Sequence, residues 1–340
     1  MDRVEVHQPG SDGTFGGLCP DGAVYNLEVE GNHNYFVDGV LVHNCHHIPC
    51  QTLQQLLANL PGRYRFGLSA TPQRDDGLTP LLYLSVGRVV ATISQEQLIT
   101  DGHLMRPKVV QVMTGWNIDA MALIPAIVER KVAEAEEEGK NARSIAGIRR
   151  FFDWDGEGRL PDWLLSEVYS ELASDEVRNY GIISLAHGLA ISKSLVLILC
   201  NRKAHCEALA LALLKKGIVA TALTGDLSKK KRAAYLDSFR AGRLQVVVAT
   251  QLADEGLDVP LLDRVILAAP SRSAGRTIQR LGRLMRPADG KQPVLYDLVD
   301  DFSSFQGQAK ARMRAYRTAL GTFDTSTIDW ANRGVQCQIV

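Results

Sequence analysis

The chain has 340 residues, with 38 basic and 38 acidic side chains and 46% hydrophobic residues, which is enough for two domains of ordinary size. Its apolar runs, such as 195–200, are far too short to cross a bilayer, and the N-terminus lacks the basic start and apolar core of a signal peptide. Six cysteines without regular spacing argue against a disulfide framework. These features predict a cytoplasmic protein in a reducing compartment.

The neutral total hides an uneven distribution of charge. Residues 1–44 have a net charge of −6, and residues 45–340 have a net charge of +6. The acidic segment is suited to attracting a basic partner, and a solvated surface explains it equally well. The positive balance of the longer segment permits nucleic-acid binding without demonstrating it.

The first elements predicted along the chain are a hairpin, a helix and a strand. Residues 24–43 alternate apolar and polar side chains around a turn at 37–39, which is the pattern of a β-hairpin. Leucines at helical spacing predict a helix over 52–60, and an apolar stretch predicts a strand over 65–70. Residues 116–180 follow as a largely helical, charged stretch in which no chemistry is evident, so exposed helices are expected there.

The second half of the chain alternates apolar strands with helices. The predicted strands cover 194–200, 219–223, 245–250, 263–268 and 293–298. The predicted helices cover 202–216, 228–241 and 274–285. Short apolar strands separated by helices of this length predict an α/β fold with a parallel sheet covered on both faces. The residues after 305 predict one helix and an uninformative tail.

The residues around position 44 form a candidate splicing junction. An Asn side-chain amide can attack its own main-chain carbonyl and cut the next peptide bond, and a nearby imidazole can assist. A following thiol can accept an acyl group. Residues 24–44 read Val-Tyr-Asn-Leu-Glu-Val-Glu-Gly-Asn-His-Asn-Tyr-Phe-Val-Asp-Gly-Val-Leu-Val-His-Asn, which resembles the C-terminal end of an intein of the Hint family. The resemblance implies these roles for Asn44, His43 and Cys45, with His33 as a further assisting residue.

The resemblance also implies a partner for splicing. A complete intein needs its own N-terminal nucleophile, and the 44 residues before the junction do not hold one. We therefore expect an upstream fragment that carries the N-terminal intein half and the N-terminal lobe of the protein that the intein interrupts. Splicing in trans would excise residues 1–44 without a cofactor. Asn26 stands where the family often has Asp, so the role of that Asp in coordinating the steps is not assigned here.

Four segments after the junction resemble, in order, the later motifs of superfamily 2 helicases of the DEAD/DEAH type. They are Cys-His-His-Ile-Pro over 45–49, Phe-Gly-Leu-Ser-Ala-Thr-Pro over 66–72, residues 247–260, and Gln-Arg-Leu-Gly-Arg-Leu-Met-Arg-Pro over 279–287. The first looks like the tail of an Asp-Glu-x-His-His box. The two acids of that box, one of which would hold Mg²⁺, are expected on the upstream fragment.

A zinc site is the competing interpretation of the first segment. Its candidate ligands are Cys45, His46, His47 and Cys50. Adjacent histidines rarely bind one metal, and no paired Cys or His motif follows at the usual spacing. The sequence therefore predicts no metal ligand in this chain.

The arginine segment, residues 279–287, is the most specific of the four. Positions 280, 283 and 286 are three apart, so one helix face presents three guanidinium groups, which repel one another unless an anion lies opposite. A solvated basic helix is the alternative for this segment alone. The resemblance makes the anion a nucleoside triphosphate, with Arg283 and Arg286 as arginine fingers.

The resemblance assigns roles to the other motif residues as well. It implies nucleic-acid backbone contact for Thr250. It implies ATP binding or coupling for His47, Ser69, Thr71, Gly256, Asp258, Gln279 and Arg280. ATP and Mg²⁺ are the cofactors expected, both only in the assembled helicase. DNA is favoured over RNA as the nucleic-acid partner, and no membrane partner is expected.

The predicted organisation follows from both resemblances. It comprises an intein fragment (1–44), the C-terminal part of a RecA-like first lobe (45–115), a helical insertion (116–180), a complete RecA-like second lobe (181–305), and a C-terminal helix and tail (306–340). We expect the isolated chain to be inactive as an ATPase, because it contains no Gly-Lys-Thr or Gly-Lys-Ser phosphate loop. Two alternatives stay open: a stranded fragment that only binds nucleic acid, or a truncated record of one continuous intein-bearing helicase gene.

Overall fold

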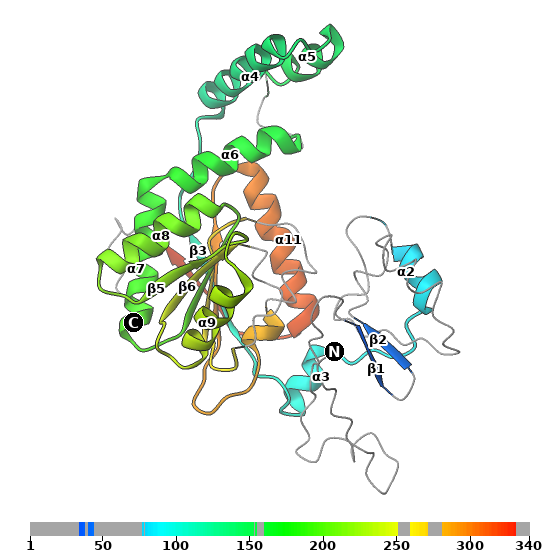
Figure 1. The fold of residues 1–340 in the computed structure, drawn as a ribbon, viewed down its shortest axis with the longest axis vertical. Helices are drawn as coiled ribbons and strands as arrows, with labels where there is room; N and C mark the ends of the chain where they lie inside the picture. Colours follow the sequence, from blue (N-terminus) through cyan, green and yellow to red (C-terminus); the bar gives the residue numbers. More distant parts are fainter. Residues whose placement is uncertain are drawn as a thin grey trace, which may run out of the picture. The chain divides into compact units, whose positions relative to one another are not determined.

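The computed structural model describes residues 34–37, 40–43, 77, 79–152, 154, 160–250, 259–270 and 281–330. The chain divides into two compact units, Met1–Val90 and Ala91–Val340. Figure 1 shows the elements of both along the chain. No helix of the described part has the length and hydropathy of a membrane span.

The first unit is described at a hairpin and a helix. Strands β1 (Asn34–Val37) and β2 (Val40–His43) pair antiparallel, with Asn34 opposite His43. The predicted hairpin is therefore confirmed at its two strands. Helix α2 (Thr79–Val86) follows. The helix predicted over 52–60 and the strand predicted over 65–70 lie outside the described residues.

The second unit contains a seven-stranded sheet with the order β5-β6-β4-β7-β8-β3-β9, and every neighbouring pair is parallel. Its strands are β3 (Lys108–Met113), β4 (Val196–Cys200), β5 (Ala220–Leu223), β6 (Val246–Thr250), β7 (Arg264–Leu267), β8 (Val294–Val299) and β9 (Thr325–Asp329). The five strands predicted in the second half of the sequence are confirmed. Their near-continuous apolar runs are buried on both faces, as a parallel sheet requires.

Helices cover both faces of this sheet (Figure 1). One core contains the buried sides of α7 (Glu176–Ile191) and α8 (Lys203–Lys215). The opposite core contains Phe239 of α9 (Lys229–Arg240), residues of the short helix at 281–284, and the C-terminal half of α11 (Ser303–Leu320). Helix α3 (Gln95–Thr100) packs against α11. The predicted helices at 202–216 and 228–241 are confirmed, and the third is described only from residue 281 onward.

The predicted helical stretch at 116–180 has a core of its own. It contains α4 (Ala120–Glu137), α5 (Ala142–Arg149), α6 (Asp162–Ser174) and the start of α7. The ring of Phe305, in α11, stacks on Trp116 at 5.8 Å and on Tyr169 at 5.1 Å between centroids. An aromatic cluster therefore joins these helices to α11, in place of the simply exposed helices expected from the sequence.

Two predicted domain boundaries differ from the structure. The first lobe was predicted to extend to residue 115, but β3 lies in the second unit's sheet, between β8 and β9. The predicted tail contains a strand, β9, and its neighbour Trp330 is buried against Gly181, where an added Cβ would lie 2.6 Å from the indole ring. Strand pairing joins residues distant in sequence, so the local pattern does not reveal which sheet a strand enters.

Candidate functional site

The carboxyl ends of the strands lie at one edge of the sheet because the strands are parallel. In open α/β sheets ligands bind outside this edge. Thr250 is the last residue of β6 and lies opposite Cys200, the last residue of β4. The Thr250 hydroxyl oxygen is buried and has no hydrogen-bond partner among the described residues. A buried polar atom of this kind favours a site that a ligand or another segment completes.

The described end of the arginine segment lies on the flank of a short helix. Leu281, Leu284 and Met285 are fully buried in the core below α11. Arg283 lies within the helix at 281–284, Arg286 follows the helix, and both side chains are half-buried. Burial lowers the pKa of Arg286 from its ordinary value. An anion opposite these guanidinium groups would offset that desolvation.

Hydrogen bonds to the carbonyl oxygens of Met285 and Arg286 hold the backbone that follows this helix. The backbone N–H of Met105 donates to the Met285 carbonyl oxygen at 2.7 Å. The Lys291 ammonium donates to the Arg286 carbonyl oxygen at 2.7 Å and to the Pro260 carbonyl oxygen at 2.9 Å. The backbone that carries the arginines is therefore held from two directions.

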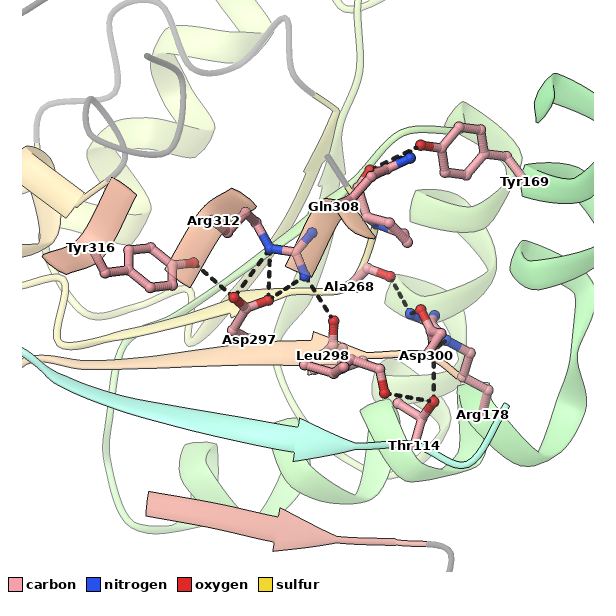
Figure 2. Close-up of polar contacts among 12 residues, drawn as sticks. Thr114, Tyr169, Arg178, Ala268, Asp297, Leu298, Asp300, Gln308, Arg312 and Tyr316 are labelled. Carbon is pink, nitrogen blue, oxygen red and sulfur yellow. Dashed lines mark hydrogen bonds and ion pairs between the residues drawn. The ribbon is translucent and has the colours of Figure 1, made fainter. Parts of the chain in front are cut away.

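A buried ion pair ties three strand ends together (Figure 2). Arg178, in α7, donates from Nε to Asp300 Oδ1 at 2.8 Å and from Nη2 to Asp300 Oδ2 at 3.1 Å. The same Nη2 donates to the Ala268 carbonyl oxygen at 2.7 Å, and Thr114 donates to Asp300 Oδ1 at 2.6 Å. Thr114 follows β3, Ala268 follows β7 and Asp300 follows β8. This cluster therefore fixes the point at which the chain leaves β7 toward the arginine segment.

A second buried pair attaches α11 to the sheet (Figure 2). Arg312 donates from Nε to Asp297 Oδ1 at 2.9 Å, and the Tyr316 hydroxyl donates to Asp297 Oδ2 at 2.9 Å. Burial alone would lower the pKa of Arg312, but the Asp297 carboxylate beside it raises that pKa above its ordinary value. The pair lies within the core, so we assign it to the stability of the fold.

His205 is a buried base near the same edge of the sheet. It lies in the first turn of α8, is 4% exposed, and its Nε2 lies 2.7 Å from Asn179 Oδ1. Burial, with a smaller contribution from the Arg178 charge, lowers the pKa of His205 from 6.5 to about 4. The ring is therefore neutral in the folded protein at neutral pH.

The His205 pKa predicts a loss of stability in mild acid. Between pH 6.5 and 4 the unfolded chain binds a proton that the folded chain does not, so stability falls as pH falls. We expect about 2 kcal/mol to be lost between pH 7 and pH 5 from this group, at about 1.4 kcal/mol per pKa unit. Urea unfolding of the wild type and of His205→Gln at pH 7 and pH 5 measures this loss in the free energy of unfolding. His103→Gln, at an exposed histidine, is the control. Equal pH dependence in wild type and His205→Gln would contradict the assignment.

The structure describes only part of the predicted site. It places Thr250, Arg283 and Arg286 in the second unit, and it places His43 at the end of β2. The remaining predicted residues lie outside the described part of the chain: His33, Asn44, Cys45, His47, Ser69, Thr71, Gly256, Asp258, Gln279 and Arg280. Their roles stay predictions.

The sequence analysis missed several polar residues that support this edge. Arg178, Lys291 and Asp300 are each less than 8% exposed and bind the segments that precede or follow the motifs. Buried charged side chains are rare unless they are paired. The sequence contained no signal for them, because each partner lies far away along the chain.

Comparison with known proteins matches residues 182–288 to the family described as helicase conserved C-terminal domain. A candidate helicase, number 22, of Sulfolobus islandicus filamentous virus (isolate Iceland/Hveragerdi) is 25% identical over 283 residues, which cover 81% of this chain and 45% of that protein. DNA 3'-5' translocase XPB2 of Sulfurisphaera tokodaii is 24% identical over 254 residues, which cover 75% of this chain and 56% of that protein. The chain thus spans about half the length of these relatives.

The fold also resembles solved structures. The structure of a single-residue variant of S. cerevisiae Dbp5, bound to RNA and ADP BeF3, superimposes with a TM-score of 0.52 at 15% identity, covering 86% of this chain and 59% of that chain. At this identity the likeness concerns the fold alone, a parallel α/β sheet like those of RecA-like helicase lobes. The segment that matches the helicase conserved C-terminal domain, residues 182–288, contains the strands from β4 to β7 of this sheet.

Proposed function

We propose that residues 45–340 are the C-terminal part of an ATP-dependent superfamily 2 helicase that moves along nucleic acid once it is joined to an upstream lobe. One observation carries this proposal. Arg283 lies half-buried in the helix at 281–284, Arg286 lies half-buried just after it, and the apolar residues between them are buried in the core. This backbone presents two guanidinium groups, which are suited to phosphate oxygens.

The half-buried setting of Arg283 and Arg286 differs from that of a solvated basic surface. Burial lowers the pKa of Arg286, and phosphate oxygens are suited to guanidinium donors. Arg283 and Arg286, with Arg280, would hold the phosphates of ATP, which supplies the phosphoryl group whose hydrolysis drives movement. In related systems an arginine in this role stabilises charge that develops as the phosphoryl group transfers.

Mg²⁺ is assigned to the upstream fragment. Its carboxylate ligands would be the Asp and Glu of the box that His47 completes. Within the described residues, no group of three or more His, Cys, Asp or Glu side chains is placed to hold a metal ion.

The remaining motif residues would couple the two lobes. Ser69 lies at the end of the strand predicted over 65–70, and Thr71 follows that strand. Gly256, Asp258 and Gln279 would contact the nucleotide. Thr250 would contact the nucleic-acid backbone. The buried Thr250 hydroxyl, without a partner among the described residues, supports this last role. We propose DNA as the nucleic acid, since the relative XPB2 is named a DNA translocase.

We further propose that residues 1–44 are removed by protein splicing. The support is the sequence resemblance together with the hairpin, which pairs Asn34 with His43 and so fixes the residue before Asn44 on a strand. Cys45 would then serve twice. It would accept the acyl group in splicing, and it would become the variable residue of the restored Asp-Glu-x-His-His box.

Nucleic-acid-stimulated ATP hydrolysis tests the helicase proposal. The isolated chain should show no turnover, because the phosphate-loop lysine and both box acids are expected on the upstream fragment. The joined protein should hydrolyse ATP in the presence of DNA. If the joined protein bound DNA without any turnover, the alternative of a non-catalytic nucleic-acid-binding fragment would be the better description.

A further inference from the structure

We infer that Lys291 is a positioning residue that holds the arginine segment in register with the segment 247–260. The inference rests on the proposed function, because it concerns the arginines proposed to act on the nucleotide. Lys291 lies in the loop between the arginine helix and β8, at a position that no sequence motif singles out.

The geometry shows one side chain bridging two motif ends. Pro260 is the last residue of the segment that contains Asp258, and Arg286 is the last of the three arginines. The Lys291 Nζ donates to the Pro260 carbonyl oxygen at 2.9 Å and to the Arg286 carbonyl oxygen at 2.7 Å. The backbones that carry the proposed nucleotide contacts are therefore joined through one amino group.

The lysine that makes the bridge is buried, and its two hydrogen bonds are partly buried, which limits the access of water to them. Lys291 is 7% exposed, although lysine is among the residues most often found at the surface. The charged groups that act on it are Asp263 and Arg286, and Asp263 is itself paired with Arg264 at 3.1 Å. Burial lowers the pKa of Lys291 to about 8, with Asp263 opposing the shift and Arg286 adding to it. Charged or neutral, the amine retains hydrogens to donate to both carbonyls.

Loss of this amine would leave two carbonyl oxygens, each now in a partly buried hydrogen bond, without this donor. The Met105 N–H would still hold the Met285 carbonyl, so the helix should stay folded. The Arg286 backbone, however, would lose its link to Pro260. In phosphoryl transfer the catalytic effect depends on position, and a displacement of about 1 Å can cost about 100-fold in rate.

The test compares Lys291→Met, which keeps the length and removes the donor, with Lys291→Arg, which keeps a donor and the charge. Lys310→Met, at an exposed lysine of α11, is the matched control. In the joined helicase we expect Lys291→Met to lower kcat for ATP hydrolysis about 100-fold, with KM for ATP within about threefold, because the loss falls on the transition state. Lys291→Arg should recover most of the rate, and Lys310→Met should match wild type.

Hydrogen exchange on the 340-residue chain gives a second readout that needs no ATPase activity. Lys291→Met should speed exchange in peptides that cover 281–287 and 259–263, and Lys310→Met should leave both unchanged. Unchanged exchange in Lys291→Met would overturn the bridge. A kcat of Lys291→Met equal to that of the wild type would overturn the positioning role. Absence of turnover in the joined wild type would instead overturn the proposed function, and with it the catalytic meaning of the bridge.

Discussion

Mixing the chain with an upstream fragment that carries an N-terminal intein half should release residues 1–44 and give one longer protein. Asn44→Ala should block release completely, because no side-chain amide remains to attack the Asn44 carbonyl. The reaction should stop at the thioester or branched stage. Cys45→Ala should prevent ligation while allowing some cleavage after residue 44, since it removes only the thiol that accepts the acyl group. Mass spectrometry of the mixtures distinguishes these products.

The junction makes a further demand on the partner. If Cys45 completes an Asp-Glu-x-His-His box, the upstream helicase fragment should end in Asp-Glu immediately before its intein half, which should begin with Cys or Ser. His7→Gln is a suitable control, because that histidine is no part of the junction motif. A ligated product from Asn44→Ala, or an upstream fragment that ends without acidic residues, would show that the junction is misassigned.

Replacing Arg283 by alanine in the joined helicase should abolish most ATP hydrolysis. Arginine fingers contribute roughly 10³–10⁵ in rate in related phosphoryl-transfer systems, and the effect falls on kcat because the charge they stabilise develops in the transition state. Arg283→Lys should recover little, since an ammonium lacks the planar donor geometry of guanidinium. Steady-state ATPase assays at saturating DNA measure both variants.

Arg314→Ala provides the matched control for that experiment. Arg314 is exposed on α11, so its loss should leave turnover and stability close to wild type. Thermal unfolding should also be similar for Arg283→Ala, because the core contacts of this helix come from Leu281, Leu284 and Met285. If kcat of Arg283→Ala were within about tenfold of the wild-type value, Arg283 would not be an arginine finger.

The sequence alone determined the α/β character of the second unit. Apolar strands such as 245–250 and helices such as 202–216 were predictable because their periodicities are local and differ from each other. The spacing of Arg283 and Arg286 predicted a common helix face, since helical geometry places residues three apart on neighbouring positions. In the structure the described helix covers 281–284, and Arg286 follows it. The structure adds that the apolar residues between them are buried in the core.

Only the tertiary structure decided which strands share a sheet and which charges are buried. β3 and β9 pair with each other, although Val109 and Thr325 are separated by most of the unit. The sequence shows whether the residues of such a strand are apolar or polar. Which strand lies beside it in the sheet depends on the path of the whole chain. For the same reason Arg178 and Lys291 looked like ordinary surface charges. Their acceptors, Asp300 and the carbonyl oxygens of Pro260 and Arg286, come together only when the loops at the sheet edge fold.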